Sequence, residues 1–372
     1  MTAAWASDLF RRVAVPRLPG SVAVAAVEQL VTEQLQGFGY EVHREPFETA
    51  TNRLRGVAAA GVGLGWCALA LFPLLVLPIH GLTATLGGVA ALALAAVVAA
   101  WIARGGGWSV DTVVTANNVV AYRGTSIRLW LVAHSDSKAQ RLSLRGRVFA
   151  FAALGIGAGG MLACLGLRVI APLPIGVVTP WIGLTLIGAV GMAGPPLVGG
   201  SSGAVDNASG MIAALAAAEG LRERTDVGVL ITGAEEFGME GARVWVAGTR
   251  RAGVFINFDG IDHVGSINIM VHARRHNAEV DSGPTLPQLL RALQEHVSAI
   301  GPPVRRSRLP LGIFVDGSVL AAGGMDGITL SRGDWSTLGV VHTARDTPER
   351  TSHESAVAVG EAVARAAAGL LS

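Results

Sequence analysis

Apolar residues are concentrated in two long stretches of the chain. Between residues 56 and 103 there is no Asp, Glu, Lys or Arg, and Arg55 and Arg104 flank this stretch. It divides at residues 78–81 into two runs of about 20 residues each, the length that crosses the core of a bilayer. Because the flanking charges lie only at the outer ends, the pattern predicts a transmembrane helical hairpin over 56–103.

The second apolar stretch covers residues 148–194, and its only charged residue is Arg168 near the middle. Proline residues follow Arg168, so two spans again fit on either side of the break. We expect a second transmembrane hairpin here, in which Gly155 and Gly159 allow close packing between helices.

The remaining segments, 1–55, 104–147 and 195–372, alternate between strand-like and helix-like patterns. Predicted strands cover 40–47, 113–122, 127–133, 227–232 and 254–258, with short strands near Ile313 and Ile328 and a last one ending at Val341. Predicted helices cover 22–38, 207–222, 286–300 and 355–371. This order predicts an α/β fold with a mostly parallel central sheet flanked by helices, into which the two hairpins are inserted.

Composition agrees with membrane segments. Hydrophobic residues make up 51% of the chain and charged residues 15%, with a mean hydropathy of +0.49, which is too apolar for an ordinary soluble enzyme. The net charge of +2 gives no support for a nucleic-acid partner. Segments 1–55 and 104–147 each carry six arginines, whereas the opposite ends of the hairpins carry only His80 and Arg168. By the positive-inside rule, the polar body is expected in the cytoplasm.

Six candidate site residues recur at similar places, after an apolar strand or at the start of a helix: His134, Asp206, Glu235, Glu236, Asp259 and His342. The carboxyl ends of parallel strands meet at one edge of a sheet, where ligands bind in open α/β folds. Carboxylates combined with imidazoles suit divalent cations, most plausibly a pair of zinc ions. Each residue alone has a simpler explanation, such as Asp206 as a helix cap. A metal site accounts for all of them together.

A serine hydrolase is a weaker alternative. Residues 199–203 match Gly-x-Ser-x-Gly around Ser201. A nucleophile elbow needs a strand directly before the serine, but prolines and a Gly/Ser-rich linker precede this motif.

Five stretches resemble the M28 family of zinc-dependent aminopeptidases and occur in that family's order: LVAHSDS, GAVDNASG, TGAEEFGMEGA, NFDGID and VHTARDT. The resemblance extends over most of the polar sequence and leaves out the two hairpins. It implies five ligands for two divalent ions: Asp206 shared by both ions, His134 and Asp259 on one, and Glu236 and His342 on the other. Glu235 would be the general base that activates water. By their spacing from the two histidines, Asp136 and Asp346 are candidates to orient the imidazoles, and the alternative for either is an ordinary loop aspartate.

The sequence therefore predicts a peptidase domain assembled from 1–55, 104–147 and 195–372, with transmembrane hairpins at 56–103 and 148–194. The expected activity is hydrolysis of amino-terminal peptide bonds beside a lipid bilayer. Two alternatives stay open: a related reaction on the same fold, such as glutaminyl cyclisation or carboxypeptidase action, and a membrane binding protein that kept a peptidase fold without catalysis. The preferred side chain of the substrate and the oligomeric state are not predicted.

Overall fold

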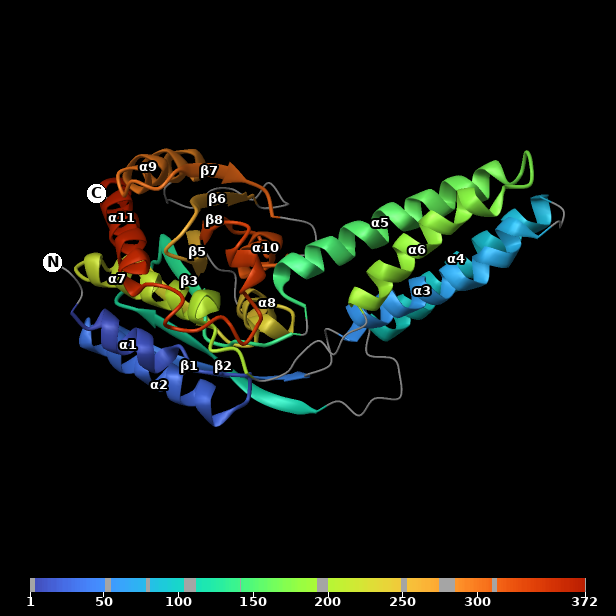
Figure 1. Ribbon diagram of the computed structural model, residues 1–372. Helices are drawn as coiled ribbons and strands as arrows, with labels where there is room; N and C mark the ends of the chain where they lie inside the picture. The colour runs from blue at the N-terminus through green and yellow to red at the C-terminus, as the bar shows by residue number, and fades with distance from the viewer. Residues whose placement is uncertain are drawn as a thin grey trace.

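The computed structural model describes residues 4–50, 55–77, 81–103, 112–140, 142–192, 200–248, 253–273, 285–309 and 313–371. These residues form an α/β body and a helical arm that projects from one side of it (Figure 1). Both termini lie on the side of the body that faces away from the arm (Figure 1).

An eight-stranded mixed sheet forms the centre of the body, in the order β1-β2-β4-β3-β5-β8-β6-β7. The strands are β1 (Glu41–Ala50), β2 (Val113–Tyr122), β3 (Leu129–His134), β4 (Val227–Thr232), β5 (Val254–Ile261), β6 (Ser266–His272), β7 (Val304–Ser307) and β8 (Asp326–Gly333). The four central strands β4, β3, β5 and β8 are mutually parallel. The pairs β1–β2, β2–β4 and β6–β8 are antiparallel, and the edge strand β7 is parallel to β6. The predicted α/β class is confirmed, and its parallel part lies at the centre of the sheet.

Both faces of the sheet are buried, which explains why its central strands are continuous apolar runs. Successive residues of a strand point to opposite faces. In β3, Leu129 and Leu131 therefore belong to one hydrophobic cluster, and Trp130 and Val132 belong to another. A charged residue at any of these positions would be left in an apolar layer.

Helices cover the two faces unequally (Figure 1). The larger cluster includes residues of α1 (Ala6–Val13), α2 (Val22–Gly37), α7 (Gly210–Gly220), α9 (Leu286–Ser298) and α11 (His353–Leu371). The smaller cluster includes residues of α8 (Glu240–Gly248) and α10 (Asp316–Ala322). The alanine-rich surface of α7 packs closely against α11, since a Cβ placed on Gly360 would lie 2.3 Å from the Ala213 carbonyl oxygen.

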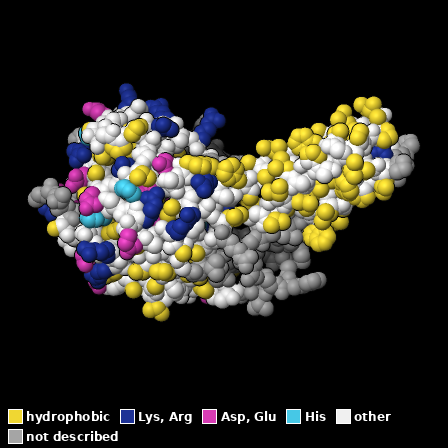
Figure 2. All heavy atoms as spheres, viewed as in Figure 1, with side chains coloured by type: hydrophobic (Ala, Val, Ile, Leu, Met, Phe, Trp, Pro, Cys, Tyr) yellow, Lys and Arg dark blue, Asp and Glu magenta, His cyan; other side chains and the backbone are white. Residues whose placement is uncertain are grey.

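Four helices make up the arm: α3 (Arg55–Val76), α4 (Gly81–Ala103), α5 (Leu144–Leu167) and α6 (Ile175–Met192). Apolar side chains cover its outer surface, whereas charged side chains are concentrated on the body (Figure 2). By length and composition, α5 and α6 could each cross a membrane, and only 33% of the apolar window of each is buried within the protein. The described parts of α3 and α4 include shorter apolar helical segments, Gly63–Val76 and Gly81–Val97.

Glycines bring α5 and α6 together, but at positions other than those we predicted. A Cβ on Gly157 would lie 2.5 Å from the backbone nitrogen of Thr185 in α6. Nothing lies within 4 Å of a Cβ placed on Gly155 or Gly159. The predicted packing pair therefore faces away from α6, because the rotation of a helix about its axis is decided by its neighbours.

Two predicted strands are wrong. Ile313 lies in irregular chain before α10, and the nearest strand is β7. Val340 and Val341 form a turn after the short helix η3 (Thr337–Gly339). Two β-branched residues are too few for a strand, and the Val341 carbonyl accepts a hydrogen bond from the Leu144 amide at the start of α5.

Burial of Glu28 in α2 makes stability depend on pH. Its carboxylate accepts a hydrogen bond from Asn117 at 3.0 Å, and burial raises its pKa to about 7. The folded protein therefore keeps a proton that the unfolded chain releases near its ordinary pKa of 4.5. The contribution of Glu28 to stability is complete below pH 4.5 and is lost as pH rises through 7.

We expect Glu28→Gln to raise the free energy of unfolding at pH 8 by about 2 kcal/mol and to leave it nearly unchanged at pH 4.5. Glu33→Gln, on the exposed face of the same helix, is the matched control and should have no such effect. Denaturation of the detergent-solubilised protein at the two pH values measures the difference. An equal change at both pH values would contradict this assignment.

Candidate metal centre

Three neighbouring parallel strands deliver candidate ligands to one edge of the sheet. His134 is the last residue of β3, and Glu236 lies in the short helix η2 (Glu235–Phe237) directly after β4. Asp259 lies in β5, where the pairing with β8 shifts register between Phe258 and Ile261. Such an irregularity changes the direction of a side chain, and here it falls at the ligand candidate. These residues meet at the carboxyl ends of the strands, the edge at which ligands bind in open α/β folds.

Asp206 lies in an irregular turn, η1 (Ala204–Ser209), that leads into α7. The turn begins at Gly203, whose φ of 54° is in the left-handed region that favours glycine. A single carboxylate holds the turn, since Asp346 accepts hydrogen bonds from the amides of Val205 at 2.7 Å and Asp206 at 3.1 Å. The side chain of Asp206 is thereby directed to the edge of the sheet.

Asp136 holds the turn that carries Glu235 and Glu236 in the same way. Its carboxylate accepts hydrogen bonds from the amides of Glu235 at 3.1 Å and Glu236 at 3.0 Å. Ala234, directly before them, has a φ of 54°, which is unusual for a residue with a side chain. The hydrogen bonds to Asp136 stabilise this conformation and fix the direction of both glutamates.

Asp136 and Asp346, the two aspartates predicted to orient the imidazoles, differ in their contacts. The His134 Nδ1 atom lies 3.1 Å from the backbone carbonyl oxygen of Asp136 and 3.5 Å from its carboxylate. His342 Nδ1 is buried without a hydrogen-bond partner among the described residues, and the hydrogen bonds of the Asp346 carboxylate go to backbone amides instead. Asp136 therefore contacts both His134 and the turn of the two glutamates, whereas the described hydrogen bonds of the Asp346 carboxylate go to the turn of Asp206.

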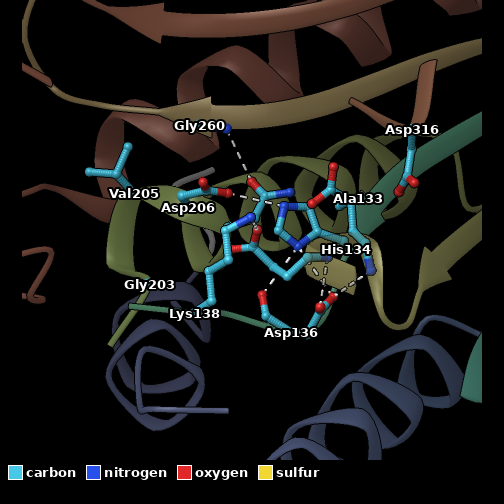
Figure 3. Close-up of polar contacts among 12 residues, drawn as sticks. Ala133, His134, Asp136, Lys138, Gly203, Val205, Asp206, Gly260 and Asp316 are labelled. Carbon is cyan, nitrogen blue, oxygen red and sulfur yellow. Dashed lines mark hydrogen bonds and ion pairs between the residues drawn. The ribbon is translucent and has the colours of Figure 1, made fainter. Parts of the chain in front are cut away.

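The candidate ligands converge on Asp206. The Nε2 atom of His134 lies 3.0 Å from one carboxylate oxygen of Asp206, and the Nε2 atom of His342 lies 2.9 Å from the other. His342 Nε2 is also 3.4 Å from Glu236 Oε1. Figure 3 shows the side chains of His134 and Asp206 pointing toward each other, with Lys138 and Asp136 beside them.

Two groups of three side chains could each hold a metal ion, and they share Asp206. One group is His134, Asp206 and Asp259, and the other is Asp206, Glu236 and His342. Within each group the possible ligand atoms all lie within 4.8 Å of one another. Glu235 belongs to neither group, although it is adjacent to Glu236.

Three buried residues of the site were missed by the sequence prediction. Lys138 Nζ lies 2.5 Å from Glu236 Oε2, and Asp316 accepts a hydrogen bond of 2.5 Å from Thr232 at the end of β4. Arg17 donates hydrogen bonds to the carbonyl oxygens of Ser135 and Gly203, which joins the loops of two ligands. Lys138 is the only lysine of the chain, a signal that could have identified it.

Burial has the largest effect on the carboxyl groups of this cluster, and repulsion between them adds to it. Burial, reinforced by the charge of Glu236, raises the pKa of Glu235 well above its usual value. Burial and the charge of Asp206 raise the pKa of Asp259 to about 7. Burial also disfavours ionisation of Asp206, but hydrogen bonds with His134 and His342 outweigh it and lower the pKa of Asp206 well below its usual value.

The residues fit divalent cations. Several carboxylates share a buried space with two imidazoles, so positive charge is needed to offset their repulsion. Buried Glu236 Oε1 and His342 Nδ1 have no hydrogen-bond partner among the described residues, and both residues belong to the second ligand group. Oxygen and imidazole nitrogen are suitable ligands for zinc.

Two cavities meet at this cluster. The larger, of about 430 Å³, extends from Asp206 and Asp259 past Trp335 to the end of β7. The smaller, of about 80 Å³, is lined by both glutamates and by His342. Asp206 and Asp259 line both cavities, so a substrate placed across the candidate ligands could occupy the two cavities at once.

The fold and the carboxylate–imidazole cluster place the protein in the class of metallohydrolases. The family model described as Peptidase family M28 matches residues 184–367, which include all the candidate ligands except His134. The chain belongs to peptidase family M28, as its motifs indicated. Among curated protein sequences, none matches the chain.

Solved structures share the fold at low sequence identity. An aminopeptidase from Aneurinibacillus sp. strain AM-1 is 13% identical, with a TM-score of 0.53 over 98% of this chain and 93% of that one. BSAP, a zinc aminopeptidase from Bacillus subtilis, is 13% identical, with a TM-score of 0.54 over 97% and 93%. Porphyromonas gingivalis glutaminyl cyclase is 15% identical, with a TM-score of 0.52 over 97% and 96%. Both kinds of enzyme therefore share this architecture.

Because Asp206 belongs to both candidate ligand groups, Asp206→Ala should remove both ions rather than one. We expect the metal content of the purified protein to fall from about two ions per chain to near zero. Elemental analysis after dialysis measures this, with Asp8→Ala, an exposed aspartate of α1, as control. Retention of two ions in Asp206→Ala would show that the bridging assignment is wrong.

Proposed function

We propose that the protein is a membrane-anchored aminopeptidase with two zinc ions, which hydrolyses the first peptide bond of its substrates. The observation that carries this proposal is the pair of three-residue groups sharing Asp206. His134 and Asp259 would complete one ion site, and Glu236 and His342 the other. No nucleic-acid partner is proposed.

When bound, the ions would acidify a water molecule and polarise the scissile carbonyl. The chain's own residues would do the rest. Glu235 lines the smaller cavity without belonging to a ligand group, so it would take the proton from water and pass it to the leaving amine. Asp136 would hold Glu235 in place through its backbone amide.

Glutaminyl cyclisation is the second candidate, because glutaminyl cyclases share the fold to the same degree as aminopeptidases. Carboxypeptidase action and metal binding without catalysis are further alternatives. A panel of peptides separates them. Release of the first residue from free but not amino-blocked peptides supports the aminopeptidase, whereas ammonia release from peptides that begin with glutamine supports the cyclase.

Replacement of Glu235 by glutamine keeps the shape of the side chain but removes its ability to accept a proton. We expect Glu235→Gln to lower kcat for peptide hydrolysis by roughly a thousandfold while the metal content stays unchanged. Steady-state kinetics and elemental analysis of the same preparation measure both quantities, with Glu33→Gln as control. Unchanged turnover would remove Glu235 from this role.

We further propose that residues 56–103 and 148–194 are transmembrane hairpins inserted into a peptidase domain formed by 1–55, 104–147 and 195–372. The length and composition of α5 and α6 support this, as does the apolar surface of the arm (Figure 2). A hairpin returns the chain to the side of the membrane where it began, so both insertions leave the body intact. The arginines of the body favour a cytoplasmic location.

Cysteine labelling tests the orientation in a background where Cys67 and Cys164 are replaced by serine. Glu223 on the body and Ile170 at the far end of the arm are both exposed, with 86% of the Glu223 side chain and 83% of Ile170 accessible. We expect a membrane-impermeant maleimide to label Ile170→Cys in intact cells and Glu223→Cys only after permeabilisation. The reverse pattern would place the body outside the cytoplasm.

A further inference from the structure

The first turn of α5 forms part of the wall of the candidate site. Leu144, at its start, packs in one cluster with Val205 and Val341, the neighbours of two candidate ligands. Just before the helix, the amide of Gln140 donates a hydrogen bond of 2.8 Å to the carbonyl oxygen of His342. The arm is thus joined to both ligand-bearing loops, and the side chains of this turn have fixed positions relative to the ligands.

Arg147, one turn into α5, lines the smaller cavity together with Glu235, Glu236 and His342. Its charge interacts with the charges of both glutamates. Its side chain is half-buried, and its hydrogen bond goes to the neutral amide oxygen of Gln140 at 3.0 Å. Among the described residues, no carboxylate forms an ion pair with it.

Arg145 provides a contrast on the same turn. Its side chain is exposed and lines neither cavity. It lies beside the turn at Gly339. Arg145 is therefore open to solvent, whereas Arg147 lines the cavity beside the glutamates.

We propose that Arg147 binds the terminal carboxylate of the substrate, so that the enzyme prefers dipeptides with a free carboxyl end. This inference rests on the proposed peptidase function. A guanidinium presents two parallel donors that match a carboxylate. The apolar side chains of Leu144, Met239 and Phe314 also line the cavity, and partial exclusion of water strengthens such an ion pair.

The two cavities would receive the two residues of a dipeptide. The smaller, of about 80 Å³, lies beside Arg147 and would receive the second residue with its carboxylate. The larger cavity, of about 430 Å³, would receive the side chain of the first residue. Arg147 lies in α5 directly before the proposed hairpin of 148–194 and outside the residues that match the family model, so this preference would belong to the helix that leads into the insertion.

Kinetics with the dipeptide Leu-Ala and its amide Leu-Ala-NH₂ test the proposal directly. We expect Arg147→Met to lower kcat/KM for the free acid by roughly ten- to a hundredfold, mainly through KM, and to change the value for the amide less than about twofold. Arg147→Lys should restore part of the preference. Arg145→Met is the matched control and should behave as the wild type, and metal content should be equal in all variants.

Equilibrium binding makes the test independent of turnover. In the Glu235→Gln background, calorimetry should show tighter binding of Leu-Ala than of its amide, and Arg147→Met should abolish the difference. If the wild type cleaves no peptide, the proposed function fails, while this binding difference still decides the role of Arg147. If Arg147→Met lowers kcat/KM and affinity equally for the acid and the amide, Arg147 only supports the structure of the site and the proposal is wrong. If it lowers neither, Arg147 does not bind the carboxylate and the proposal is also wrong.

Discussion

The cost of burying several carboxylates close together is the constraint on which the site depends. Asp206 and Glu236 come from two separate turns and Asp259 from strand β5, yet all three lie close together in a largely buried space beside Glu235. Such a cluster persists only if its backbone is held rigidly and positive charge lies within it. The structure meets the first condition with a sheet buried on both faces and with carboxylates that bind the amides of the ligand-bearing turns. Two imidazoles and Lys138 contribute to the positive charge that the cluster needs. The carboxylate oxygens and imidazole nitrogens also suit divalent cations as ligands.

The helical arm also contributes to the structure of the candidate site. Its helix α5 begins at Leu144, and its first turn packs against the loops of Asp206 and His342. Phe149, one turn further, makes an edge-to-face contact with Trp335 of the body at a ring distance of 5.5 Å. An insertion that enters between two ligands could easily have displaced them. Here the inserted helix instead completes the cavity, so the geometry of the centre and the position of the arm are coupled.

Some features of the site were predictable from the local sequence, and others were not. Buried parallel strands are continuous apolar runs, so β3, β4 and β5 and the polar residues at their ends were predictable, including His134 and Glu236. Local sequence patterns did not predict features that depend on a contact with a distant part of the chain. The turn at Val341 is decided by a hydrogen bond from the start of α5, and the packing glycine of α5 is Gly157 because α6 contacts that side of the helix. Asp346 binds the amides of a turn about 140 residues earlier, which spacing within its own motif could not reveal.

The sequence by itself determined the class of fold, the two apolar insertions and the identity of the candidate ligands, because periodicity, charge-free runs and residue chemistry are local properties. The tertiary structure alone decided that Asp206 lies between two imidazoles, that Asp136 and Asp346 hold backbone amides, and that Arg147 lines the cavity. These relations join residues far apart along the chain. Their distances depend on how the sheet, its loops and the arm pack together, and no local pattern records that packing.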